Sequence, residues 1–122
     1  MTAVDIQEIA HRITSEDEAL SVASQLSDEF AAGAGVRDAQ RLLPHDEVRT
    51  LARSGLLGLS VPKEFGGIDA STETLAEVFR LLAEGDPSIA QIPHSHFTFL
   101  EALRYQGSNE QKQFFYAEAL SG

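Results

Sequence analysis

The chain has 122 residues and no cysteine, and its 9 basic and 19 acidic side chains give a net charge of −10. This negative charge repels nucleic-acid phosphates and anionic membrane surfaces, so we expect neither as a partner. The absence of cysteine excludes disulfide frameworks and thiolate metal sites. With 43% hydrophobic residues, the chain is long enough to bury one core, and we expect a single domain.

Neither the start of the chain nor its apolar runs are typical of a targeting or membrane segment. Met1 to Arg12 is polar and contains Asp5 and Glu8, unlike a secretory signal. The longest nearly apolar run, Leu56 to Val61, is too short to span a bilayer. We therefore expect a soluble, cytoplasmic protein whose first residues, 1–14, form a loosely ordered segment.

Helical periodicity predicts two helices in the first half of the chain. Ser15, followed three residues later by a glutamate, has the pattern of a capping box. We expect this helix to end at Gly33 and Gly35, before a polar linker. Pro44 suits the first turn of a second helix, which stops at Gly55. The residues expected to face inward are Ala19, Ala23, Leu26, Phe30, Val48, Leu51 and Ala52.

The segment after the second helix is apolar and short. Because an isolated run makes a poor sheet, we interpret Leu56 to Val61 as a buried connector. Gly66 and Gly67 indicate a tight turn and match no phosphate-binding glycine motif. Ser71 or Thr72 then caps a third helix. Its apolar stripe contains Leu75, Val78, Phe79 and Leu82.

Two more helices are predicted at the end of the chain. The fourth runs from about Ser88 to Tyr105, and Pro93 should either kink it or mark its effective start. A second capping-box pattern begins at Ser108 and opens the fifth helix. The residues expected inward are Ile89, Ile92, His96, Leu100, Leu103, Phe114, Phe115 and Leu120. The sequence thus predicts an all-α bundle of about five helices.

The histidines are the best candidates for metal-binding or catalytic residues. Residues two apart on a helix point about 200° away from each other, so His94 and His96 cannot grip one metal ion, and we expect no metal site. His96 shares a helix face with Ile92, Phe99 and Leu100. From spacing alone, a hydrogen-bonded core histidine is favoured over a functional one. The residues alone support only an acidic helical domain without a complete catalytic constellation.

Two stretches, taken in their order and separation, resemble the acyl-CoA dehydrogenase superfamily. Ser54 to Gly67 looks like that family's helix end, buried connector, proline and double-glycine turn. Gly107 to Lys112 looks like the loop that opens the last helix of its N-terminal domain, and Asp86 to Ser88 lies where the family has a helix start. The resemblance covers residues 15–122. It implies an N-terminal helical domain, with a β-barrel and a C-terminal helical domain that are absent from this chain.

Within the superfamily, Gln91 to Phe97 is most similar to the flavin-dependent monooxygenases, which use reduced flavin and dioxygen on organosulfur compounds. The resemblance therefore implies FMN or FAD, a small organosulfur substrate, and a tetramer at full length. It also reverses the interpretation of His96, which aligns with a histidine beside the flavin. On the same helix face, Ile92, Ser95 and Phe99 would line the substrate pocket.

Two alternatives to this function remain open. The chain could be the N-terminal domain of an acyl-CoA dehydrogenase, with an acyl-CoA substrate and electron transfer to an acceptor. It could also be a stand-alone helical interaction module without catalysis. On either flavoenzyme hypothesis most flavin contacts lie in other domains, so we expect this fragment alone to be inactive.

Overall fold

The computed structural model describes residues 9–122, and every regular element in this range is helical. The predicted all-α class is therefore confirmed for these residues. The helices are α1 (Glu16–Gln40), α2 (His45–Arg53), η1 (Leu56–Gly58), η2 (Lys63–Phe65), α3 (Thr72–Gly85), α4 (Pro87–Gln91), α5 (His94–Gln106) and α6 (Asn109–Ser121). None of these helices has the length and apolar composition that a membrane crossing requires.

The prediction of a loosely ordered start falls partly outside the described residues, since residues 1–8 are not among them. Over residues 9–14 the chain has no helix, but Ala10 and Ile13 are buried. The backbone N–H of His11 donates to the carbonyl of Arg53 at the end of α2. This part of the chain therefore packs on the bundle.

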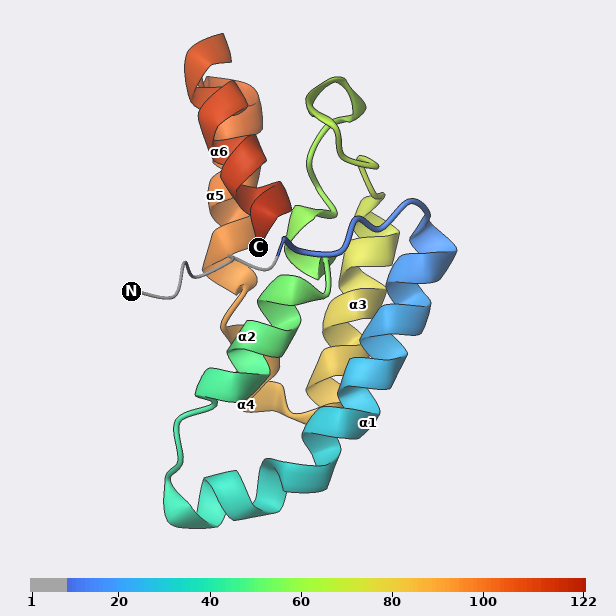
Figure 1. Cartoon of the computed structure of the whole chain (residues 1–122), viewed down its shortest axis with the longest axis vertical. Helices are drawn as coiled ribbons and strands as arrows, with labels where there is room; N and C mark the ends of the chain where they lie inside the picture. Colours follow the sequence, from blue (N-terminus) through green and yellow to red (C-terminus); the bar gives the residue numbers. More distant parts are fainter. Residues whose placement is uncertain (1–8) are drawn as a thin grey trace, which may run out of the picture.

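The helices enclose two adjoining apolar clusters. Figure 1 shows α1 and α3 side by side, and α5 and α6 as a separate pair, while α2 packs on η1. The first cluster, between α1 to α4 and η1, includes Phe30, Leu51, Leu56, Leu59, Val78, Leu82 and Ile89. The second, between α5, α6 and the segment after η1, contains Val61, Leu100, Leu103, Tyr116, Ala119 and Leu120. The segment from Leu56 to Val61 contributes to both clusters, so it joins the two halves of the domain.

This segment is the buried connector that the sequence predicted. Leu56, Leu59 and Val61 are almost completely buried. Gly55, just before η1, has φ of 89°, and a Cβ atom there would lie 2.3 Å from the carbonyl oxygen of His11. Only glycine meets both demands, so the connector begins at a fixed point of the backbone.

The predicted helix caps are confirmed at three positions. The hydroxyls of Ser15, Ser71 and Ser108 each accept a hydrogen bond from the backbone N–H three residues on, at 3.1 to 3.2 Å. At Ser108 the glutamine three residues on completes a reciprocal capping box. The capping box predicted at Ser15 is only half formed, because the Glu18 carboxylate accepts from the backbone N–H of Thr14 instead of that of Ser15. These local interactions hold the starts of α1, α3 and α6 independently of tertiary packing.

The predicted end of the first helix is wrong. Instead of stopping at Gly33 and Gly35, α1 continues to Gln40, and Arg41, with φ of 53°, ends it. Figure 1 shows that its last turns bend away from the first part. An interior glycine costs a helix only about 1 kcal/mol, so the pair of glycines allows a bend without requiring an end.

The predicted fourth helix is divided at Pro93, one of the two outcomes expected there. α4 ends at Gln91 and α5 begins at His94, in a new direction (Figure 1). The prediction that Ile92 faces inward is wrong, because its residue is 48% exposed. Ile92 lies before the change of direction, so it does not continue the buried face of α5.

The burial predicted for α6 is also partly wrong. Phe114 and Phe115 are 61% and 39% exposed, whereas the adjacent Tyr116 is buried. Successive helical residues are about 100° apart, so three consecutive aromatic side chains cannot all face one core. Leu120 is buried as predicted, and it lies four residues after Tyr116 on the same face.

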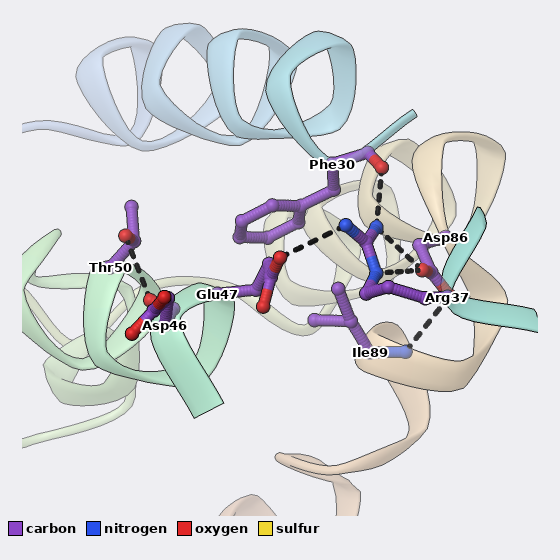
Figure 2. Close-up of polar contacts among 7 residues, drawn as sticks. All are labelled: Phe30, Arg37, Asp46, Glu47, Thr50, Asp86 and Ile89. Atoms are coloured by element: carbon purple, nitrogen blue, oxygen red, sulfur yellow. Dashed lines mark hydrogen bonds and ion pairs between the residues drawn. The ribbon is translucent and has the colours of Figure 1, made fainter. Parts of the chain in front are cut away.

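A partly buried ion-pair network around Arg37 joins α1, α2 and α4 (Figure 2). The Arg37 guanidinium lies 2.8 Å from the Asp86 carboxylate and 3.0 Å from that of Glu47. It also donates to the backbone carbonyl of Phe30, at 2.5 Å, within the same helix. A Cβ atom at Gly33 would lie 2.5 Å from Nη1 of Arg37, so this glycine leaves room for the guanidinium.

Asp86 has a second role as the N-cap of α4. Its carboxylate accepts hydrogen bonds from the backbone N–H groups of Ser88 and Ile89, at 2.9 and 3.3 Å. Burial alone would raise the pKa of Asp86, but the hydrogen bonds from Arg37 and from these two N–H groups together lower it below its usual value. The charged carboxylate is therefore the form that stabilises the fold.

We expect Asp86→Asn to destabilise the domain by about 3 kcal/mol near neutral pH, since it leaves Arg37 without its buried counter-ion. A carboxylate with a lowered pKa contributes stability above its ordinary titration range, near 3.8, and loses it as the pH falls further. Urea unfolding from about pH 7 to pH 2 should show the gap between wild type and variant narrowing on acidification.

The control is Glu84→Gln, which breaks an exposed ion pair with Arg80 on the surface of α3. This variant should unfold like the wild type. An Asp86→Asn protein as stable as the Glu84→Gln protein would contradict a stabilising role for the buried pair.

A second constraint lies where α3 ends against α1. A Cβ atom on Gly85 would lie 2.3 Å from the carbonyl oxygen of Ser27, and both residues are buried. By contrast, a Cβ atom on Gly35 would meet nothing within 4 Å. The two helical glycines therefore allow a matched comparison, because a methyl group would clash at Gly85 and would meet only open space at Gly35.

We expect Gly85→Ala to cost about 1 to 3 kcal/mol because α1 and α3 must move apart. Gly35→Ala should instead stabilise the protein by about 0.5 to 1 kcal/mol through its helix propensity. Thermal unfolding of both variants measures the difference, and equal midpoints would contradict close packing at Gly85.

Candidate functional site

His96, the main candidate from the sequence, lies in the first turn of α5 and is half-buried. Its Nε2 atom is 2.7 Å from the carbonyl oxygen of Leu57 in η1. The ring of Phe97 packs edge-on against the imidazole, with centroids 5.0 Å apart. The imidazole is thus held from the connector and from its own helix.

His96 lines an open groove between η1, α5 and α6, with a volume of about 250 Å³. Phe99 and Phe115 form an aromatic wall along it, packed edge to face with centroids 5.3 Å apart. Phe114 extends this wall at 5.1 Å from Phe115. The full lining is Leu57, His96, Phe99, Leu100, Phe115, Glu118, Ala119 and Gly122.

The four site residues predicted from the resemblance are only partly brought together. His96 and Phe99 share the groove. Ile92 and Ser95 are exposed and do not line it. Phe115 lines the groove, although the sequence predicts it in the core. The signal that could have found it is the run of three consecutive aromatic residues from Phe114, which one helix cannot bury on a single face.

The groove fits a flat aromatic ring and does not fit a phosphate. Its wall is formed by aromatic and aliphatic side chains, with one imidazole at the edge. Of the described residues that line the groove, Glu118 alone has a charged side chain, and its negative charge would repel the phosphate of FMN. These residues can therefore contact the isoalloxazine ring or an aromatic substrate, while a flavin phosphate needs cationic partners elsewhere.

Other polar side chains serve the fold. Among residues 9–122, no group of three or more His, Cys, Asp or Glu side chains could hold a metal ion. Arg104 of α5 donates to the carbonyl of Ser60 and to the carboxylate of Asp69, both at 2.8 Å. The Asp69 hydrogen bond raises the pKa of Arg104 above its usual value. This cation fixes the loop after the connector to the helix that carries His96.

The buried hydroxyls of Ser60 and Tyr116 have no hydrogen-bond partner in the described part of the chain. Burial raises the pKa of the Tyr116 hydroxyl. Tyr116 packs against Phe65, with ring centroids 5.0 Å apart, inside the second apolar cluster. Neither hydroxyl lines the groove.

Known proteins with similar sequences are monooxygenases by name. Dibenzothiophene monooxygenase of Rhodococcus erythropolis is 32% identical over 112 residues, which cover 92% of this chain and 27% of that protein. A protein of Pseudomonas putida named probable FMNH2-dependent monooxygenase SfnC is 34% identical, covering 84% of this chain and 29% of that protein. The chain thus spans somewhat more than a quarter of the length of these relatives.

Solved structures agree with the predicted fold. The crystal structure of FMN-bound TdsC from Paenibacillus sp. A11-2 matches with a TM-score of 0.74 and 33% identity, covering 84% of this chain and 26% of that one. Its complex with FMN and indole matches equally well. The family model described as "Acyl-CoA dehydrogenase, N-terminal domain" matches residues 14–122, nearly the whole chain. The resemblance found in the sequence is therefore confirmed: this chain belongs to the acyl-CoA dehydrogenase N-terminal domain family.

Proposed function

We propose that this chain is the N-terminal domain of a reduced-flavin-dependent monooxygenase that acts on a small organosulfur compound. Its role is to form one wall of the flavin and substrate pocket. The observation that carries the proposal is the groove in which a positioned His96 borders an exposed aromatic wall of Phe99 and Phe115. The names of the relatives, two of which mention monooxygenase activity, support the reaction type.

The reaction requires a flavin, FMN or FAD, that supplies two electrons for the activation of dioxygen. One oxygen atom forms a bond to the sulfur of the substrate, and the other leaves as water together with the two hydrogens of the reduced flavin. The residues of this domain contribute an aromatic surface, which the remaining domains would cover, and a fixed imidazole. Exclusion of water from one side of the site favours transfer of oxygen to the sulfur over loss of oxidising equivalents to solvent.

The domain is proposed to cover residues 15–122, with the β-barrel and C-terminal helical domains supplying most flavin contacts. Among residues 9–122, no Lys or Arg lines the groove, which agrees with this division, because the phosphate would then be bound by residues of the other domains. Ile92, just after α4, and Ser95, in the first turn of α5, are both exposed and are proposed to line the substrate pocket once the remaining domains cover that surface. A tetrameric assembly and a cytoplasmic location belong to the same proposal.

The test uses an enzyme that contains this domain together with its remaining domains, supplied with reduced FMN, dioxygen and dibenzothiophene. We expect His96→Ala to lower the oxygenated product formed per flavin oxidised by about tenfold, the effect of losing one hydrogen bond of about 1.4 kcal/mol. Chromatography of the product and the absorbance of the flavin give the ratio. Gel filtration checks that assembly is unchanged.

His94→Ala is the matched control, since His94 is exposed on the same helix and does not line the groove. It should leave the yield per flavin unchanged. A yield that is equally unchanged in His96→Ala would contradict the role proposed for His96. Bleaching of the flavin by an acyl-CoA would favour the dehydrogenase alternative. If the protein is stable but binds no flavin even when the other domains are present, the interaction module would be favoured.

A further inference from the structure

We infer that the Leu57 carbonyl fixes His96 as the Nε2–H tautomer, so that His96 meets its ligand through Nδ1, as a hydrogen-bond acceptor. The 2.7 Å distance between Nε2 and this carbonyl oxygen is that of a good hydrogen bond. A carbonyl oxygen can only accept, so the hydrogen must be on Nε2. In the neutral ring the other nitrogen, Nδ1, then carries a lone pair and no hydrogen.

The orientation of the ring is fixed as well as its tautomer. A half-turn of the imidazole would place a carbon atom against the Leu57 carbonyl and lose the hydrogen bond. The edge of Phe97 packs against the ring and holds its plane, while the hydrogen bond to Leu57 selects between the two half-turn orientations. Nδ1 makes no hydrogen bond with any residue in the range 9–122, so it remains available to a ligand.

The carbonyl that performs this task belongs to a rigid part of the chain. Leu57 follows Gly55, whose backbone conformation and close approach to His11 fix the start of η1. Its neighbour Leu56 is buried in the first apolar cluster. Leu57 is therefore a positioning residue that acts on the site through His96.

The tautomer decides which partner His96 can hydrogen-bond. The assignment of that partner rests on the proposed function. A neutral imidazole that presents only Nδ1 needs a ligand atom carrying a hydrogen. The sulfur of a thioether carries none, whereas the reduced flavin ring has N–H groups. We therefore assign the Nδ1 contact to the flavin, and leave the organosulfur compound to the aromatic side of the groove formed by Phe99 and Phe115.

The tautomer is measured directly on this chain by ¹⁵N-resolved NMR of the imidazole at about pH 9, where an ordinary histidine ring is neutral. The nitrogen that correlates strongly with both carbon-bound ring protons is Nε2. We expect it to resonate as the N–H type and Nδ1 as the unprotonated type. The reverse assignment, or an average of the two as in a free histidine, would overturn the inference. The exposed His94 serves as the averaged reference.

A pair of substitutions tests the two nitrogens separately. Glutamine can place an amide N–H near the position of Nε2 and keep the bond to Leu57, whereas asparagine places its amide oxygen near the position of Nδ1. We expect His96→Asn to melt about 3 to 6 °C below His96→Gln, the shift that corresponds to one hydrogen bond in a domain of this size. In the multidomain enzyme the order should reverse, with His96→Asn retaining more product per flavin oxidised than His96→Gln.

The outcomes separate this inference from the proposed function. Equal melting of the two variants, or a higher yield from His96→Gln, would overturn the Nδ1 assignment and leave the monooxygenase proposal standing. An Nε2–H tautomer combined with an unchanged yield in His96→Ala would instead contradict the proposed function, while the ring geometry would stand.

Discussion

The ion pair between Arg37 and Asp86 is the interaction on which the arrangement of the two halves depends. Arg37 belongs to the last turns of α1, beyond the bend, and Asp86 is the residue that caps α4. Because α4 leads through Pro93 directly into α5, the direction in which α5 leaves the first core is set at this point. Two buried charges are costly unless both are fully hydrogen-bonded, and here the guanidinium and carboxylate have protein partners on several sides (Figure 2).

The candidate site lies where a second fixed part of the chain, the connector, meets α5. The carbonyl of Leu57 in η1 accepts a hydrogen bond from His96 in α5. Arg104, also in α5, donates to the carbonyl of Ser60 and so holds the end of the connector to the same helix. The ring is thus positioned by contacts far apart in the sequence. A site built on rigid elements is suited to hold one atom, Nδ1, in a constant place toward a ligand. The aromatic wall beside it, formed by Phe99 and Phe115, has no hydrogen-bonding side chain and suits an apolar substrate.

Local patterns predicted the fold well, and tertiary contacts account for what they missed. The serine caps, the break at Pro93 and the connector depend on neighbouring residues, so they could be predicted from the sequence. The continuation of α1 past Gly33 could not, because it depends on Arg37 meeting an aspartate 49 residues away. For the site, the family resemblance indicated His96 and Phe99, but the Leu57 carbonyl has no side-chain signature. In α6 it is Tyr116 that faces inward, where its ring packs against Phe65. The neighbouring Phe115 is therefore turned toward the surface.

Whether His96 is the contact of this domain with the flavin can be seen in a crystal structure. The crystal should contain an enzyme with this domain and its partner domains, bound to FMN. We expect Nδ1 of His96 within hydrogen-bond distance of the isoalloxazine ring, Nε2 still on the Leu57 carbonyl, and the phosphate outside the groove. A flavin bound away from the groove between α5 and α6, or an imidazole turned so that Nε2 faces the flavin, would contradict it.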